Sequence, residues 1–187
     1  MSKLSKVYIV SAPSGAGKTS LLKALIEQNS DVSISVSHTT RKARSQEING
    51  QHYHFVTHEI FEQMIGNGDF IEYANVFDHY YGTSKASVEA LMQKSLDIVL
   101  EIDWKGARKA REIFKENCVS IFILPPSLEA LHERLVKRAQ DLQEVIERRT
   151  QDAQKEASHA KEYDYVIIND NFNEALADLK HIFVCKS

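Results

Sequence analysis

The sequence predicts a three-layer α/β fold in which a five-stranded parallel sheet is flanked by helices. Four short apolar runs, rich in β-branched residues, lie at residues 7–10, 98–102, 119–124 and 165–168. Stretches with helical periodicity separate these runs. Strands that are apolar on both faces and alternate with helices are typical of a parallel sheet buried on both sides.

The first strand is followed by an expected helix over residues 20–27 and by a fifth strand over residues 32–36. In this fifth strand three apolar residues alternate with two serines. Alternation indicates that one face of the strand is less buried than the other. We therefore expect this strand at an edge of the sheet.

Residues 39–84 differ in composition from the rest of the chain and predict a small mixed or antiparallel insertion beside the main sheet. The Asn49-Gly50 pair favours a tight hairpin turn, and aromatic residues are frequent in the stretches that follow. The expected elements are strands at residues 52–56 and 70–77 and a helix over residues 58–65 that is closed by Gly66.

A second excursion from the sheet is expected after Pro125-Pro126. Ser127 suits the N-cap of a helix, and leucines at positions 128, 131 and 135 form a stripe with helical spacing. The run as far as Glu156 is highly charged. Taken alone, such a segment predicts an exposed helical hairpin.

Composition limits the class of protein. Of 187 residues, 43% are hydrophobic and 26% are charged, and the formal net charge is −3. These values predict one ordinary globular domain, and they exclude a general affinity for nucleic acid or for an anionic membrane. Any anion site must therefore come from a local group of basic residues.

The cysteines and the apolar runs indicate in which cellular compartment the protein is expected. Cys118 and Cys185 lie far apart in the sequence, which suits neither a structural zinc site nor a disulfide framework. No apolar stretch approaches the ~20 residues of a membrane-spanning helix, and the run at residues 7–10 is too short for a signal peptide. We expect a cytoplasmic protein with two free thiols.

The strongest motif lies at residues 12–19, between the first strand and the helix that follows. It matches the phosphate-binding loop Gly-x-x-x-x-Gly-Lys-Ser/Thr, except that Ala12 stands at the first glycine. Gly15 and Gly17 allow backbone N–H groups to converge on a phosphate. Lys18 would reach the terminal phosphates, and the Thr19 hydroxyl suits Mg²⁺. The strand–loop–helix context disfavours the alternative, a glycine-rich turn with an incidental lysine.

Further motifs follow in order over essentially the whole chain. With residues 11–20 they comprise residues 37–56 (from Ser37-His38-Thr39-Thr40-Arg41 to Phe55-Val56), Glu72, His79-Tyr80-Tyr81-Gly82-Thr83, Leu100-Glu101-Ile102-Asp103, Arg138, Arg148-Arg149 and residues 163–169. Together they closely resemble the guanylate kinase family, nucleoside monophosphate kinases that phosphorylate GMP with ATP. The resemblance implies a P-loop core (residues 1–36, 85–126 and 157–187), a GMP-binding segment (37–84) and a helical lid (127–156).

The resemblance implies that Arg41 and Arg44 hold the phosphate of GMP, with hydroxyl groups of Tyr53 and Tyr81 as further donors. Arginine suits this role because its guanidinium group can make two hydrogen bonds to one phosphate. Without the surrounding motif, two arginines in a polar loop would be read as solvated surface charges. The implied GMP-binding residues are Ser37, Arg41, Arg44, Glu47, Tyr53, Glu72, Tyr81, Gly82, Thr83 and Asp103.

Recognition of guanine is assigned by the resemblance to two carboxylates. Guanine presents N1–H and N2–H₂ as donors and O6 as an acceptor. Glu72 and Asp103 would accept from the donor edge, with hydroxyl groups of Ser37 and Thr83 near O6. Glu72 could instead be a solvent-facing strand residue. Asp103, or Glu101, could instead help to organise Mg²⁺ through water.

The ATP side is assigned in the same way. The resemblance implies that Arg138 and Arg149 approach the ATP phosphates from the lid and that Asn169 contacts adenine, although Asn169 could instead end a strand before a turn. The implied ATP-binding residues are Ser14, Gly15, Ala16, Gly17, Lys18, Thr19, Ser20, Arg138 and Asn169. The implied catalytic residues are Lys18, Arg41, Arg44, Arg138 and Arg149. Mg²⁺ bound with ATP is the only metal expected, with Thr19 as its protein ligand.

The sequence therefore predicts transfer of the γ-phosphoryl group of ATP to GMP or dGMP. One alternative is a catalytically weak, guanylate-kinase-like module that binds phosphopeptides, and another is a kinase that acts on a phosphorylated sugar. The chain departs from the family pattern at Ala12, at Ser45-Gln46, where Pro-Gly is common, and at Ala139, where glycine is usual. The sequence does not predict an oligomeric state.

Overall fold

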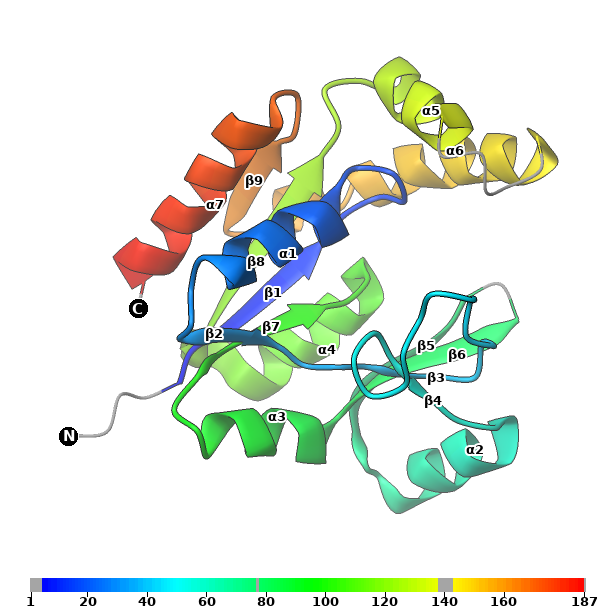
Figure 1. The fold of residues 1–187 in the computed structure, drawn as a ribbon, viewed down its shortest axis with the longest axis vertical. Helices are drawn as coiled ribbons and strands as arrows, with labels where there is room; N and C mark the ends of the chain where they lie inside the picture. Colours follow the sequence, from blue (N-terminus) through cyan, green and yellow to red (C-terminus); the bar gives the residue numbers. More distant parts are fainter. Residues whose placement is uncertain (1–4, 77, 138–142, 187) are drawn as a thin grey trace. The chain divides into compact units, whose positions relative to one another are not determined.

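The main sheet has five strands in the order β2-β7-β1-β8-β9. They are seen in the computed structural model, which describes residues 5–76, 78–137 and 143–186 (Figure 1). The strands are β1 (Val7–Ser11), β2 (Val32–Ile34), β7 (Asp97–Glu101), β8 (Cys118–Leu124) and β9 (Tyr165–Ile168). Strand β2 lies at an edge, as its alternation predicted, and it pairs with β7 in parallel. The predicted α/β fold is confirmed.

The chain divides into two compact units, each of which is described here by itself. Unit 1 contains residues 1–8 and 31–118, and unit 2 contains residues 9–30 and 119–187. In the part of the chain that the structure describes, no helix is both long and apolar enough to cross a membrane. Both cysteines are free.

Unit 1 contains a second, mixed sheet with the strand order β4-β3-β6-β5. Its strands are β3 (His38–Thr39), β4 (His54–Phe55), β5 (Phe70–Val76) and β6 (His79–Ser84). The helices of unit 1 are α2 (His58–Asn67), α3 (Lys85–Met92), α4 (Trp104–Phe114) and the short η1 (Lys115–Asn117). Aromatic side chains form its interior, and Phe61 stacks on Phe70 with ring centroids 4.4 Å apart.

Two local predictions for this insertion were wrong. The turn at Asn49-Gly50 does not join an antiparallel hairpin, because β4 pairs with β3 in parallel, even though Gly50 has the positive φ of 80° that such a turn requires. Helix α2 does not end at Gly66. It continues to Asn67, and Gly68, at φ 71°, caps it. The Gly68 N–H donates to the Ile65 carbonyl and the Asp69 N–H to the Met64 carbonyl, each at 3.0 Å.

Unit 2 contains the helices α1 (Lys18–Glu27), α5 (Leu128–Lys137), α6 (Gln143–Ala157), the short η2 (Ala160–Glu162) and α7 (Phe172–Lys186). The predicted N-cap of α5 is confirmed, since the Ser127 hydroxyl accepts from the Ala130 N–H at 3.1 Å. Helices α5 and α6 lie side by side (Figure 1). Leu131 and Leu135 of α5 form one buried cluster with Ile146 and Ala153 of α6. Residues 138–142, with Arg138 and Ala139, lie outside the described residues.

Candidate functional site

The glycine-rich segment of unit 2 forms a loop ahead of helix α1. Gly15 and Gly17 have φ angles of 92° and 93°, a region in which side chains are strained, so both positions require glycine. The loop closes on itself through a hydrogen bond from the Ala16 N–H to the Pro13 carbonyl at 3.1 Å. Gly17 is the N-cap of α1, and Lys18 is its first residue.

The first turn of α1 suits an anion. It contains no acidic residue, and the unpaired N–H groups at a helix N-terminus carry positive partial charge. Thr19 and Ser20 are exposed there, and Lys18 is half-buried. Three polar or charged side chains and the backbone donors of the loop are thus grouped at one helix end.

Asn169 is brought to this loop by tertiary folding. It follows β9 and is only 5% exposed. Its side-chain Nδ2 donates to the Ala16 carbonyl at 2.7 Å. Of the two arginines that the family resemblance assigns to a lid, Arg149 is half-buried in α6, and Arg138 lies outside the described residues.

Arg41 in unit 1 is braced by Glu47. The two guanidinium nitrogens Nη1 and Nη2 donate to the two carboxylate oxygens at 2.9 and 2.7 Å. Glu47 also accepts from the Arg44 N–H at 2.7 Å. The hydrogen bond from Arg41 is the main reason that the pKa of Glu47 is lowered to about 2, so this carboxylate is charged at neutral pH. Glu47 therefore fixes the position of Arg41 and of the backbone at Arg44.

Two tyrosines lie beside this pair. The rings of Tyr53 and Tyr81 meet edge to face at 5.9 Å, and the Arg41 guanidinium carbon lies 5.5 Å from the centre of the Tyr53 ring. Burial, with a smaller effect from the negative charge of Glu101, raises the pKa of Tyr53 to about 12. Its hydroxyl stays protonated at neutral pH and can donate a hydrogen bond.

Glu72 is a buried carboxyl group on β5, only 5% exposed, so the reading of it as a solvent-facing residue is wrong. One oxygen, Oε1, accepts from the Thr83 N–H at 3.0 Å and from the Thr83 hydroxyl at 2.7 Å. Burial raises the pKa of Glu72 to about 7, against the opposing effect of the bonds from Thr83. Such a group is poised to accept hydrogen bonds from a ligand that favours its charged form.

Asp103 lies two residues after the end of β7 and caps helix α4. Its Oδ1 accepts from the Gly106 N–H at 2.7 Å. Gly106 is also close to the other carboxylate, because a methyl group at this position would lie 2.5 Å from Oε2 of Glu72. Gly106 therefore lies next to both carboxylates: its N–H binds Asp103, and its Cα faces Glu72. The sequence motifs had not singled out this glycine.

Two other predicted residues serve the second sheet through their backbones. The Ser37 carbonyl accepts from the His54 N–H at 2.9 Å. Gly82 in β6 faces two rings, because a methyl group there would lie 2.9 Å from both Phe61 and Phe70. Glycine at this position lets the aromatic interior of unit 1 approach the strand.

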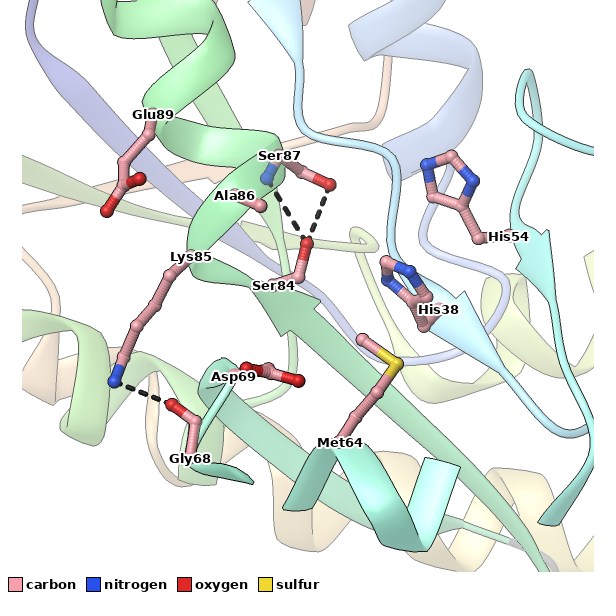
Figure 2. A pocket seen from close by; sticks show the side chains of 10 residues that line it. All are labelled: His38, His54, Met64, Gly68, Asp69, Ser84, Lys85, Ala86, Ser87 and Glu89. Atoms are coloured by element: carbon pink, nitrogen blue, oxygen red, sulfur yellow. Dashed lines mark hydrogen bonds between the residues drawn. The ribbon is translucent and has the colours of Figure 1, made fainter. Parts of the chain in front are cut away.

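Unit 1 has a pocket of about 550 Å³ whose lining includes none of the predicted site residues (Figure 2). The rings of His38 and His54, which line this pocket, stack on each other with their centroids 4.6 Å apart. The hydroxyl groups of Ser84 and Ser87 share a hydrogen bond of 2.7 Å. Burial, together with the charge of His54, lowers the pKa of His38 to about 4, so this ring is neutral at pH 7. A neutral imidazole supplies no charge for a phosphate.

Among the described residues, no group of three or more histidine, cysteine, aspartate or glutamate side chains could hold a metal ion. The hydroxyl of Thr19, at the first turn of α1, is an oxygen donor of the kind that Mg²⁺ accepts. Any Mg²⁺ at this loop would take its other ligands from phosphate oxygens of a bound ligand and from water.

Comparisons with known proteins agree on one family. The family model for guanylate kinase matches residues 4–185. A guanylate kinase of Alkalilimnicola ehrlichii is 54% identical over 95% of this chain and 87% of its own length. One of Chromohalobacter salexigens is 59% identical over 92% of this chain and 80% of its own length. The crystal structure of guanylate kinase from Anaplasma phagocytophilum, 35% identical, has a TM-score of 0.80 and covers 98% of this chain and 87% of its own.

Proposed function

Because the chain belongs to the guanylate kinase family, we propose that it transfers the γ-phosphoryl group of ATP to the phosphate of GMP or dGMP. It is an ATP-dependent nucleoside monophosphate kinase. The observation that carries the choice of GMP is the buried carboxylate of Glu72, held by Thr83. Adenine and the pyrimidines lack the pair of adjacent donors that guanine presents to such a group.

We propose that unit 1 holds GMP. Glu72 accepts from N1–H and N2–H₂ of guanine, and Asp103 supports this edge from the start of α4. Arg41, aligned by Glu47, and Arg44 bind the phosphate, with Tyr53 and Tyr81 as hydroxyl donors. A site built to hydrogen-bond a base rejects a base that leaves its polar groups unpaired.

We propose that unit 2 holds ATP. Backbone N–H groups of residues 14–20 and the ammonium group of Lys18 bind the phosphate chain. Thr19 supplies a hydroxyl to Mg²⁺, which when bound neutralises part of the phosphate charge. The donor set fits this ion, because a hydroxyl is a hard oxygen ligand.

In the reaction a phosphate oxygen of GMP attacks the γ-phosphorus of ATP in line. The new bond joins this oxygen to phosphorus, and the bond from phosphorus to the bridging oxygen breaks, so ADP leaves with the electron pair. The attacking oxygen is already ionised at neutral pH, so positioning and charge stabilisation supply the catalysis. We assign this stabilisation to Lys18, Arg41, Arg44, Arg138 and Arg149.

Two segments complete the proposal. Residues 37–84 form the GMP-binding segment, and residues 127–156 form a lid that excludes water when both nucleotides are bound. We also propose that the chain works in the cytoplasm, where its two free thiols remain reduced.

The test is a coupled assay of ADP release with GMP, dGMP, AMP, CMP and UMP as acceptors. We expect turnover with GMP and dGMP and only background with the other three. Turnover with AMP equal to that with GMP would remove the role of Glu72 in base selection. No turnover with any acceptor, together with tight binding of a phosphopeptide, would favour the non-enzymatic alternative.

A further inference from the structure

Asn169 lies where three segments of unit 2 meet: the end of β9, helix α5 and the phosphate loop. Its backbone is held from two sides. Its N–H donates to the Leu124 carbonyl at 2.7 Å, and its carbonyl accepts from Nη2 of Arg134 in α5 at 2.8 Å. Asn169 therefore occupies a fixed place in unit 2 before its side chain is considered.

The side chain of Asn169 is directed at the loop. Its Nδ2 donates to the carbonyl oxygen of Ala16 at 2.7 Å, and the residue is 5% exposed. A methyl group at Gly17 would collide with the same Nδ2 atom. The amide thus contacts the loop at the peptide unit that joins Ala16 to Gly17.

This contact determines which way that peptide unit points. The C=O and N–H of a trans peptide lie on opposite sides of the bond. A hydrogen bond that holds the Ala16 carbonyl towards Asn169 therefore directs the Gly17 N–H away from Asn169. A phosphate-binding loop works only when its N–H groups point at the ligand, so an unheld peptide could rotate and lose this donor.

Helix α5 supports the neighbouring glycine. A methyl group at Gly15 would lie 3.0 Å from Cδ2 of Leu135 and 3.7 Å from Leu131, so the helix packs directly on the loop. The same helix carries Arg134, which holds the backbone of Asn169. Both positive-φ glycines of the loop, Gly15 and Gly17, are thus in contact with one connected group of residues in α5 and at Asn169.

From this arrangement we infer that Asn169 is a positioning residue for the phosphate chain of ATP and that Arg134 acts through it. Asn169 orients the Gly17 N–H towards the phosphates. Helix α5 helps to hold the loop through Leu135, which packs on Gly15, and through Arg134, which binds the Asn169 carbonyl. The inference rests on the proposed function, and it differs from the adenine contact that the family resemblance implies. The two roles predict different responses to a ligand that has phosphates and no base.

Inorganic tripolyphosphate is such a ligand, and its affinity can be measured by calorimetry on the full chain. We expect Asn169→Ala to weaken tripolyphosphate binding about tenfold or more, which corresponds to the loss of one buried hydrogen bond. The KM for ATP should rise, and GMP affinity should not change. The matched control is Asn173→Ala, an exposed asparagine on α7, which should change none of these values.

Unchanged tripolyphosphate affinity in Asn169→Ala, with a relaxed preference for ATP over other nucleoside triphosphates, would overturn the inference in favour of base contact. Arg134→Met, which removes the donor to the Asn169 carbonyl, should weaken tripolyphosphate binding in the same direction, and Arg134→Lys should restore part of it. If Asn169→Ala does not fold, this pair decides the question. Absence of GMP turnover in the unsubstituted chain would count against the proposed function alone, since tripolyphosphate binding is measured separately.

Discussion

Replacing Gly106 with alanine should weaken GMP binding without unfolding the chain. Gly106 lies in the first turn of α4, and its added methyl group would lie 2.5 Å from Oε2 of Glu72 and 3.0 Å from its Cδ. The carboxyl group would have to retreat by about 0.9 Å to reach an ordinary contact of 3.4 Å. Because Glu72 is buried in a packed interior, this movement cannot occur without a change in its hydrogen bonds.

The size of the effect follows from those bonds. Oε1 of Glu72 accepts from Thr83 at 3.0 and 2.7 Å, and a shift of this size would break at least one of the two. A hydrogen bond to a charged group contributes about 1.5–3 kcal/mol. Alanine is favoured over glycine in a helix by about 1 kcal/mol, which offsets part of the loss in stability. The displaced carboxylate would still be misplaced for its hydrogen bonds with guanine, so we expect GMP affinity to fall about 10- to 100-fold.

Calorimetric titration with GMP and steady-state KM values for both nucleotides measure this effect. We expect the KM for GMP to rise and the KM for ATP to stay within about twofold, because neither Gly106 nor Glu72 is among the residues assigned to ATP. Gly66→Ala is the matched control, because Gly66 also lies in a helix of unit 1 and has open space around it. An unchanged GMP affinity in Gly106→Ala would refute the role of this contact in holding Glu72.

Four further predictions concern charged groups. Because burial raises the pKa of Glu72 to about 7 and guanine needs its ionised form, the KM for GMP should fall as pH rises from 6 to 8, and Glu72→Gln should flatten this profile and raise the KM. The same raised pKa means that Glu72 contributes stability that is fully present below its ordinary pKa of 4.5 and is lost as pH rises through 7. The unfolding free energy of the unsubstituted chain should therefore fall over this pH range. That of Glu72→Gln should lack this fall, because glutamine does not titrate. Lys18→Ala should lower kcat by about 100-fold or more with the thermal midpoint unchanged, and an unaltered kcat would remove Lys18 from phosphoryl transfer. Arg149→Ala should lower kcat about tenfold or more with GMP affinity intact, and calorimetry that showed lost GMP affinity would contradict its assignment to the ATP phosphates.

Patterns that are local in sequence predicted the elements that depend on neighbouring residues. The apolar runs predicted the strands of the main sheet, and the glycines before Lys18 predicted a phosphate-binding loop. The structure adds that Gly15 and Gly17 both have positive φ, a requirement that single residues impose. Local turn chemistry was less decisive in the insertion. Asn49-Gly50 forms a turn, but the strand after it, β4, pairs in parallel with β3 and not as one arm of an antiparallel hairpin.

The sequence by itself determined the fold class, the phosphate loop and the family to which the chain belongs, because each depends on short motifs in a fixed order. Only the tertiary structure showed that Gly106 faces Glu72 and that Arg134 reaches Asn169, which in turn reaches Ala16. These contacts join residues that are 34, 35 and 153 positions apart. No periodicity or motif relates such positions, since their proximity arises only when the strands and helices that carry them are packed together.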